Sequence, residues 1–307
     1  MATVMISGGT GLIGQAITKA LIEKNYSVII LTRRKPNENV SNKVSFAEWD
    51  PEKRIINEEI FSNIDYIIHL AGANVAEKRW TEKRKNEIVT SRVKSGELLA
   101  KCIAKYPGKV KAVISASAIG WYGADDVIPN PHPFTEEAPP DNDFLGATCK
   151  KWENAISGVK ETGTRLIILR TGIVLSNKGG AFTEFRKAIK LNIVPVLGSG
   201  KQMISWIHID DLVRLYIYAL ENEKLRGVYN AVAPVPVSNK QLMKTLGSNL
   251  IKHSISVHIP SLLIKMLLGE ISVEVLKSCT VSSEKIQKHD FQFLYPTIES
   301  AIEDLTK

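Results

Sequence analysis

The sequence predicts an α/β protein with a doubly wound parallel sheet and a smaller, mixed α/β lobe on its C-terminal side. Apolar, β-rich runs alternate with amphipathic helical patterns along residues 1–175. Parallel strands need a crossover helix between them, so this alternation indicates βαβ units. The strand runs also lack a period of two, which is typical of strands that are buried on both faces of a sheet.

The expected elements follow one another in the order that such units require. The predicted strands are 3–7, 26–32, 44–49, 66–71, 111–117 and 165–171. One predicted helix begins near residue 12, and two others cover 81–105 and 143–159. Beyond them, short strands are expected near 194–197, 203–208 and 227–230, helices near 210–222 and 238–250, and small helices over the last fifty residues. We therefore expect a core over 1–175, an interleaved substrate lobe over 176–250 and a helical segment over 251–307.

Composition and cysteine usage narrow the class of protein. The 307 residues are 44% hydrophobic and 23% charged, which excludes disordered and fibrous proteins. The three cysteines are far apart and odd in number, so no disulfide framework is expected. No apolar run reaches the roughly 18 residues of a membrane span, and the chain starts directly with a predicted core strand. We expect a cytoplasmic protein without a membrane partner.

The net charge of +8 leaves several partners open. Residues 78–111 contain eleven Lys or Arg and three Glu, and phosphate contacts drive nucleic-acid binding. These basic residues are nevertheless spread around a predicted helix without interleaved aromatic residues, so a solvated helix face is expected and nucleic acid is not. The apolar tract 259–268 is expected to cover the core or to form a contact in a possible homodimer.

A glycine-rich loop between the first strand and the first helix gives the clearest functional signal. Residues 7–14 satisfy the Gly-x-Gly-x-x-Gly spacing in the context of a βαβ unit, which disfavours a turn that only needs glycines. Gly8 permits the tight turn, Gly11 lets the backbone approach a pyrophosphate, and Gly14 lets helix and strand pack closely. The sequence therefore predicts a Rossmann-type dinucleotide site. Its expected contacts in this loop are Gly8, Thr10, Gly11, Leu12, Ile13 and Gly14.

The end of the second strand predicts which dinucleotide binds. An NAD site would place Asp or Glu there to accept hydrogen bonds from the ribose 2′-hydroxyl. This chain instead reads Thr32-Arg33-Arg34-Lys35, and the next carboxylate is that of Glu38. Basic side chains suit the 2′-phosphate of NADP through charge-assisted contacts. The sequence therefore predicts NADP, with a solvated basic turn as the alternative.

Several segments together carry a resemblance to a known family. The glycine loop is followed in order by Ile67–Asn74, Ser115–Gly123, Leu169–Ile173 and Trp206–Asp211. This series resembles the extended short-chain dehydrogenases/reductases, which include NAD-dependent epimerase/dehydratases of nucleotide sugars. More narrowly, the chain resembles an atypical, sugar-nucleotide-epimerase-like subgroup that carries an uncharacterised C-terminal segment. The segments typical of this subgroup are Phe144–Glu153, Ser205–Ile209 and the end of the chain from Leu268 to Pro296.

The resemblance implies NADP(H) and gives roles to residues outside the loop. The residues that it implies at the cofactor are Thr32, Arg33, Leu70, Ala71, Gly72, Glu87 and Arg92. Of these, Arg33 is expected at the 2′-phosphate, and Leu70 and Ala71 at the adenosine and ribose. Glu87 and Arg92 are expected to turn polar groups toward the cofactor from the following helix. Solvated helix charges are the alternative for both.

The proton-transfer pair of the superfamily is missing from this chain. In its Tyr-x-x-x-Lys pair, the lysine cation lowers the tyrosine pKa, so that the phenol can exchange a proton with a substrate hydroxyl. None of the eight tyrosines here has a lysine four residues later. The matching place holds Phe144 and Leu145, with Thr148 and Cys149 one turn later.

Two other side chains are candidates for the chemistry. Ser117 matches the superfamily serine and could polarise a carbonyl group, and Tyr122 offers a phenol without a lysine partner. A polar wall or a packed helix face is the alternative for each. We expect hydride transfer to or from an unidentified small carbonyl, hydroxyl or nucleotide-sugar-like substrate. The alternative is a non-catalytic, NADP(H)-binding regulator or redox sensor.

No metal site is expected from the histidines. Their spacing matches no ligand motif, and His69 lies in an apolar run typical of a core histidine. His208 is expected to pack at the end of a strand, while Asp210 or Asp211 caps the helix that follows.

Overall fold

A computed structural model of the chain describes residues 1–33, 42–189, 192–251 and 253–307. The strands of its main sheet are β1 (Thr3–Ser7), β2 (Ser27–Thr32), β3 (Val44–Asp50), β4 (Ile55–Ile56), β5 (Tyr66–His69), β6 (Ala112–Ala118), β7 (Arg165–Thr171) and β12 (Gly227–Ala231). They lie in the order β12-β7-β6-β5-β1-β2-β3-β4, and only β4 pairs antiparallel. The strand order reverses between β1 and β5, which is where open α/β sheets bind ligands. The predicted doubly wound sheet is confirmed.

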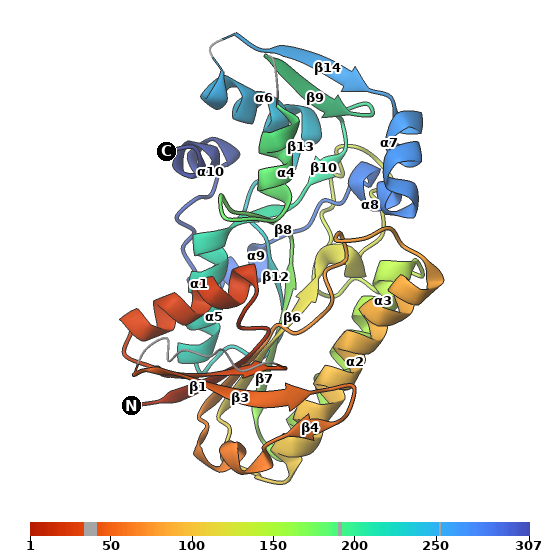
Figure 1. The fold of residues 1–307 in the computed structure, drawn as a ribbon. Helices are drawn as coiled ribbons and strands as arrows, with labels where there is room; N and C mark the ends of the chain where they lie inside the picture. The colour runs from red at the N-terminus through yellow and green to blue at the C-terminus, as the bar shows by residue number, and fades with distance from the viewer. Residues whose placement is uncertain (34–41, 190–191, 252) are drawn as a thin grey trace.

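Helices cover both faces of this sheet (Figure 1). On one face lie α1 (Leu12–Glu23) and α5 (Ile209–Glu221), and on the other lie α2 (Glu82–Ala104) and α3 (Phe144–Ser157). Each face has its own buried apolar cluster, one built around Ile17 and Leu212 and the other around Leu99 and Ile156. Because both faces of the strands are covered, the strands read as continuous apolar runs in the sequence.

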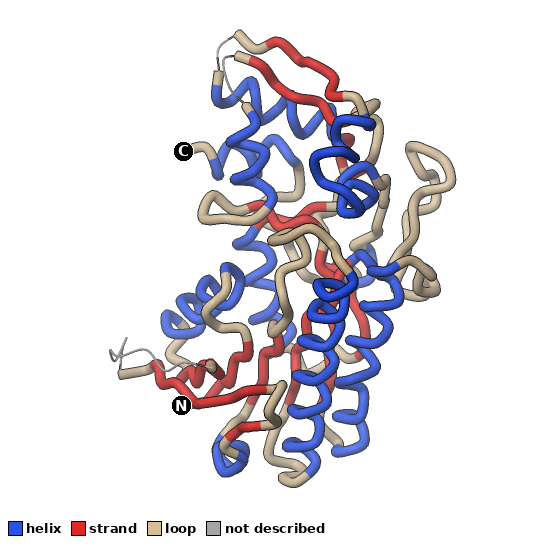
Figure 2. Tube along the Cα trace, turned by 45° about the vertical axis from the view of Figure 1, so that its right-hand side comes forward, coloured by secondary structure: helices blue, strands red, loops and turns tan. Residues whose placement is uncertain are grey.

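A smaller lobe lies beyond the carboxyl ends of the strands and encloses a third apolar cluster. It contains the strands β8 (Ile173–Leu175), β9 (Ile193–Leu197), β10 (Met203–Ile204), β11 (Trp206–His208), β13 (Val237–Ser238) and β14 (Ile255–Ile259), and the helices α4 (Ala181–Ala188), α6 (Asn239–Leu250) and α10 (Ile298–Leu305). The paired strands β9 and β14 form the tip of the lobe, at the top of Figures 1 and 2. β14 differs from the helical pattern expected after residue 251, because its residues gain a parallel partner far away in the sequence.

The remaining elements are short helices. They are α7 (Ser261–Leu268), α8 (Ser272–Leu276), α9 (Glu284–Gln287) and the 3₁₀ turns η1 (Glu58–Asn63), η2 (Ile119–Trp121), η3 (Gly158–Thr162) and η4 (Gly269–Ile271). The expectation that the tract 259–268 covers the core is wrong for α7, which buries Ile264 but leaves Leu262 and Leu267 67% and 70% exposed. A contact between two copies stays a prediction. Within the described ranges, every helix is too short or too polar to cross a bilayer.

Candidate functional site

The glycine-rich loop joins β1 to α1 at the carboxyl edge of the sheet. Gly8 has a φ of 72°, and a Cβ on it would lie 2.9 Å from the carbonyl carbon of Leu70. A Cβ on Gly14 would lie 2.4 Å from the carbonyl oxygen of Gly8. Both positions need glycine, because the loop is packed between the end of β5 and the first turn of α1.

The start of α1 is open toward an anion. A Cβ on Gly11 would meet only the carbonyl oxygen of Gly8, at 3.3 Å, and both Thr10 and Gly11 are exposed. The N-cap residue Gly11 has no side chain that could cap the helix, and the first turn contains no acidic residue. The first N–H groups of the helix, those of Leu12 and Ile13, are therefore left for a ligand, and the helix dipole favours negative charge there. This geometry fits a pyrophosphate.

The neighbouring strand brings a basic side chain to the same edge. β2 pairs with β1 and ends at Thr32, and the exposed Arg33 follows directly. Arg34 and Lys35, the other members of the predicted basic cluster, lie outside the described residues. The end of β2 thus carries a guanidinium group where an NAD site would carry a carboxylate.

The end of β5 forms the opposite wall of this site. The Leu70 N–H donates to the Ser7 carbonyl oxygen at 3.0 Å, which places Leu70 and Ala71 beside the glycine loop. Gly72 lies under the guanidinium of Arg92, since a Cβ on Gly72 would be 3.0 Å from Arg92 Cζ. Arg92 Nη1 donates to the carbonyl oxygens of Ala73 at 2.9 Å and of Ile88 at 3.0 Å. Of the two predicted residues of α2, Arg92 is therefore in the site wall.

Glu87, the other predicted residue of α2, has a different environment. Its side chain is 57% exposed, and it accepts a 2.7 Å hydrogen bond from Arg84 Nη1. This hydrogen bond lowers the pKa of Glu87. The pairing matches the alternative of a solvated helix charge, and contact between Glu87 and the cofactor stays a prediction.

A buried histidine connects the glycine loop to α2. His69 is fully buried, with Ser7 Oγ 2.7 Å from Nδ1 and Ser95 Oγ 3.4 Å from Nε2. Ser95 in turn donates to the Arg92 carbonyl oxygen at 3.0 Å. Burial, together with the charge of Arg92, lowers the pKa of His69 to about 4, so its ring is neutral at pH 7. His69 is a core histidine, as its apolar neighbours indicated.

The beginning of α3 shows what stands in place of the missing Tyr-x-x-x-Lys pair. Leu145 and Cys149 pack against η2, where a Cβ on Gly120 would lie 3.1 Å from Leu145 Cβ and 3.8 Å from Cys149 Sγ. The Cys149 thiol contacts the Ala118 carbonyl oxygen at 3.7 Å. Burial raises the pKa of Cys149 to about 12, so the thiol keeps its proton at pH 7. These two side chains therefore do not replace the proton transfer of the superfamily pair.

Ser117 and Tyr122 belong to one buried network. Ser117 Oγ donates to Glu153 Oε1 at 2.7 Å, and Glu153 also accepts two hydrogen bonds from Arg170, at 2.9 and 3.1 Å. Arg170 Nη1 donates to the Tyr122 hydroxyl at 3.1 Å, and that hydroxyl donates to Asn230 Oδ1 at 2.6 Å. The network ties β6, β7 and β12 to α3.

This network argues against the catalytic roles expected of both residues. Tyr122 is fully buried, and burial raises the pKa of its hydroxyl to about 12. Its hydroxyl already donates one hydrogen bond and accepts another, so it has no free proton for a substrate. The hydroxyl proton of Ser117 is likewise held by a carboxylate. The geometry thus favours the polar-wall alternative for Tyr122 and leaves Ser117 as an acceptor.

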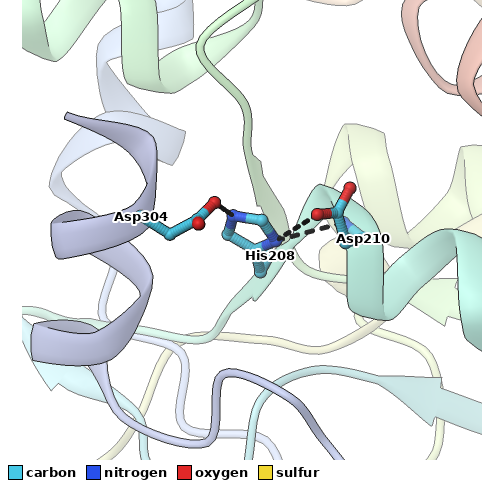
Figure 3. Close-up of side chains that lie close together, drawn as sticks. All are labelled: His208, Asp210 and Asp304. Carbon is cyan, nitrogen blue, oxygen red and sulfur yellow. Dashed lines mark hydrogen bonds and ion pairs between the residues drawn. The ribbon is translucent and has the colours of Figure 1, made fainter. Parts of the chain in front are cut away.

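His208 is the centre of a small polar cluster at the start of α5 (Figure 3). The expectation that an aspartate caps this helix is wrong, because the Asp210 N–H donates to His208 Nδ1 at 3.1 Å and the histidine itself is the cap. Its Nε2 lies 3.5 Å from Asp304 Oδ2 of α10. The three ligand-type atoms lie within 4.8 Å of one another, but the carboxylates approach different ring nitrogens. The cluster joins two helices and does not present three ligands to one ion.

Sequence reasoning missed the residues that attach the C-terminal segment. The buried Asp211 accepts the N–H groups of Leu294 and Tyr295 at 2.7 and 2.9 Å. Asp125 accepts hydrogen bonds from the hydroxyls of Ser278 and Thr280 at 2.7 and 2.8 Å. No local pattern identifies these acceptors, because their partners are more than 80 residues away in the sequence.

Comparisons with known proteins add to this geometry. A model of the NAD dependent epimerase/dehydratase family matches residues 4–231, and a model of a domain of unknown function matches residues 259–305. An epimerase family protein of Staphylococcus saprophyticus is 35% identical over 313 residues, and the match covers 99% of each chain.

Solved structures show the same architecture. The human epimerase family protein SDR39U1 (isoform 2), solved with NADPH, is 27% identical, with a TM-score of 0.86 and 99% of each chain covered. UDP-glucuronic acid 4-epimerase from Bacillus cereus, solved with UDP-glucuronic acid and NAD, has a TM-score of 0.80, and the match covers 99% of this chain and 98% of that one. Because the two sequences are only 18% identical, this likeness shows the fold alone. The chain belongs to the NAD-dependent epimerase/dehydratase family and resembles its atypical short-chain dehydrogenase/reductase members.

Proposed function

We propose that this protein binds NADP(H) across the β1–α1 loop and transfers hydride between this cofactor and a small carbonyl or hydroxyl substrate. The observation that carries the proposal is the uncapped, open N-terminus of α1, with the guanidinium of Arg33 at the end of the adjacent strand. A human relative that is similar over the whole chain was solved with NADPH, which supports the phosphorylated cofactor.

Each wall of the site has a distinct role in this proposal. The N–H groups of Leu12 and Ile13 bind the pyrophosphate, and Arg33 binds the 2′-phosphate through charge-assisted hydrogen bonds. Leu70 and Ala71 border the adenosine and ribose. When bound, the cofactor supplies or accepts the hydride. Ser117 lies at the end of β6 and offers its oxygen only as an acceptor, because its hydroxyl donates its hydrogen bond to Glu153.

A second function is supported by the start of α3. The matching place holds Phe144 and Leu145, with Thr148 and Cys149 one turn later, and the Cys149 thiol keeps its proton at pH 7. The Tyr122 hydroxyl is buried in the network. A cofactor-binding regulator or redox sensor needs no such group, and it would bind NADPH without oxidising it stoichiometrically.

A nucleic-acid function has less support. Several basic side chains of 78–111 pair with carboxylates outside that stretch, so their charge is partly neutralised within the molecule. The pairs are Lys85–Glu270, Lys94–Glu52, Lys105–Glu58 and Lys111–Asp65. The proposed partner is therefore a small-molecule substrate, and neither nucleic acid nor a membrane is proposed as a partner. We also propose that the protein forms a homodimer.

The substitution Arg33→Asp tests the cofactor assignment. Fluorescence titration is expected to show at least about tenfold weaker binding of NADPH, with the affinity for NADH nearly unchanged, because only NADPH carries the 2′-phosphate. The exposed Arg226 precedes β12 at the opposite edge of the sheet, so Arg226→Asp is the matched control and should change neither affinity. Equal weakening of both cofactors by Arg33→Asp would contradict the assignment.

Turnover separates the two functions. Purified protein is mixed with NADPH and a panel of aldehydes, ketones and nucleotide sugars, and the absorbance of the reduced nicotinamide is followed. Oxidation beyond one equivalent supports hydride transfer, whereas tight binding without oxidation supports the regulator.

A further inference from the structure

The outermost strand of the lobe tip, β14, has a free edge. It pairs in parallel with β9, and among the described residues no other strand pairs with it. The N–H of Ile255 and the carbonyl oxygen of Ile259 form hydrogen bonds with the β9 side, at 2.8 and 2.9 Å. Such bonds alternate along a parallel strand, so the backbone groups of Ser256 and His258 point to the opposite edge. These groups are available to another strand.

One face of the two-stranded ribbon of β9 and β14 is apolar and open. Every side chain on this face is apolar, and the face consists of Ile193, Pro195, Leu197, Ile255, Val257 and Ile259. Ile193, Ile255 and Val257 are 43%, 70% and 40% exposed. The other face of β9 packs into the lobe, where Val194 and Val196 are fully buried. The open face is therefore not used by the core of the lobe.

This edge lacks the usual protection against pairing. Natural edge strands carry charged residues, proline or a bulge, or another element covers them. From Ile255 to Ile259 the chain has no Lys, Arg, Asp, Glu or Pro. The exposed apolar helix α7 lies beside the end of β14 in both views (Figures 1 and 2). The exposed side chains of this ribbon face and of α7 total roughly 800 Å², the share of one partner in a standard interface.

The sequence of β14 fits a second copy of itself. If two copies pair antiparallel about a twofold axis at Val257, Ser256 lies opposite His258 of the other copy. These two residues then exchange both N–H···O bonds, with the backbone groups that β9 leaves free. On the open face Val257 lies opposite Val257, and Ile255 lies opposite Ile259. Every cross-strand pair on that face is thus apolar, as a twofold interface requires of a self-complementary surface.

We propose that two copies of this protein join through β14, so that their two ribbons form one four-stranded sheet in the order β9-β14-β14-β9. The inference rests on the homodimer of the proposed function and names its surface. The pairing removes the free edge of β14 in each copy and covers apolar side chains of the open face, and α7 extends the contact. β14 lies at the tip of the lobe, away from the β1–α1 loop (Figure 1), so NADPH binding does not depend on the pairing.

A charge at the centre of the interface tests the proposal. Val257→Lys places two ammonium groups opposite each other on the twofold axis. It is expected to raise the dimer dissociation constant at least about tenfold in analytical ultracentrifugation, because like charges repel across an interface. The control is Val235→Lys, which puts the same charge on a valine of the same lobe that is 48% exposed and lies outside the ribbon. Its dissociation constant should stay within about twofold of wild type. Circular dichroism verifies that both variants are folded.

A disulfide tests the register without adding charge. In the proposed pairing the two Val257 Cα atoms lie about 4.5 Å apart, within the span of a disulfide. Val257→Cys should therefore form a covalent dimer under mild oxidation, seen on a non-reducing gel. Ser256→Cys is the control, because the two residues at this position are two places out of register and beyond that span. The three native cysteines are buried, so the new thiol is the accessible one.

The outcomes separate this inference from the proposed function. A dimeric wild type whose dissociation constant is unchanged by Val257→Lys, or whose Val257→Cys variant does not cross-link, would overturn the inference alone. A wild type that is monomeric at all concentrations would overturn both the homodimer and this surface. Titration of the same samples with NADPH tests the cofactor proposal separately. A dimer that cross-links at Val257→Cys but does not bind NADPH would overturn that proposal and support the inference.

Discussion

The neutral His69 makes the stability of this protein depend on pH. In the unfolded chain its pKa is near the ordinary value of 6.5, whereas burial lowers the pKa of the folded state to about 4. As the pH falls from 7 to 4, the unfolded chain therefore takes up a proton before the folded protein does, and the free energy of unfolding decreases. At about 1.4 kcal/mol per pH unit between the two values, the decrease due to His69 is about 3 kcal/mol at pH 4.

Urea denaturation at several pH values between 7 and 4 measures this contribution. His69→Asn is expected to be less stable at pH 7, because the ring and its contact with Ser95 are lost. Its free energy of unfolding should, however, decrease by about 3 kcal/mol less than that of wild type over the same pH range. The difference between the two proteins isolates His69, since His208 and the buried carboxylates titrate in both. His132→Asn replaces an exposed histidine and is the control.

Parallel pH profiles for wild type and His69→Asn would refute this reasoning. They would mean that the folded protein binds a proton at position 69 as readily as the unfolded chain does. The contacts of Ser7 and Ser95 with the ring would then have to rearrange around an imidazolium.

Three further substitutions have defined outcomes. Gly14→Ala should reduce the free energy of unfolding in urea by about 1–3 kcal/mol and weaken NADPH binding at least about tenfold, because the new Cβ would lie 2.4 Å from a carbonyl oxygen. A variant more stable than wild type would show that the loop can shift freely. Glu153→Gln should cost about 3–5 kcal/mol in the same assay, because Arg170 stays buried without a counter-charge; a loss below about 1 kcal/mol would contradict this. Asp211→Asn should cost about 1.5–3 kcal/mol and speed amide hydrogen exchange at Leu294 and Tyr295, and unchanged exchange would show that other contacts hold the segment.

The predictions that succeeded concern local sequence. β1 and β7 begin and end at the predicted residues, and α2 begins and ends within one residue of its prediction. The glycines of the loop were also interpretable, because Gly8 has a positive φ and a Cβ on Gly14 would meet the carbonyl oxygen of Gly8, which is close in the sequence. Hydrophobic periodicity and steric requirements act over such short distances, so a single sequence carries them.

The candidate site was predicted only in part. Tyr122 looked available because its hydroxyl partners, Asn230 and Arg170, are 108 and 48 residues away in the sequence. Glu87 and Arg92 were both expected at the cofactor, with Arg92 nearer the buried edge of the helix, and the packing of α2 against β5 and α3 places only Arg92 beside Gly72. The exposure of α7 was unpredictable for the same reason, since an apolar helix does not indicate whether another element covers it.

The sequence by itself determined the order of the βαβ units, the open anion site at the start of α1 and the basic residue at the end of β2. Each of these follows from the chemistry of neighbouring residues. Only the tertiary structure decided which polar groups are buried and which partners they have, because burial and hydrogen bonding join residues from distant parts of the chain. The neutral His69 and the enclosed Tyr122 exist only once the helices have packed onto the sheet.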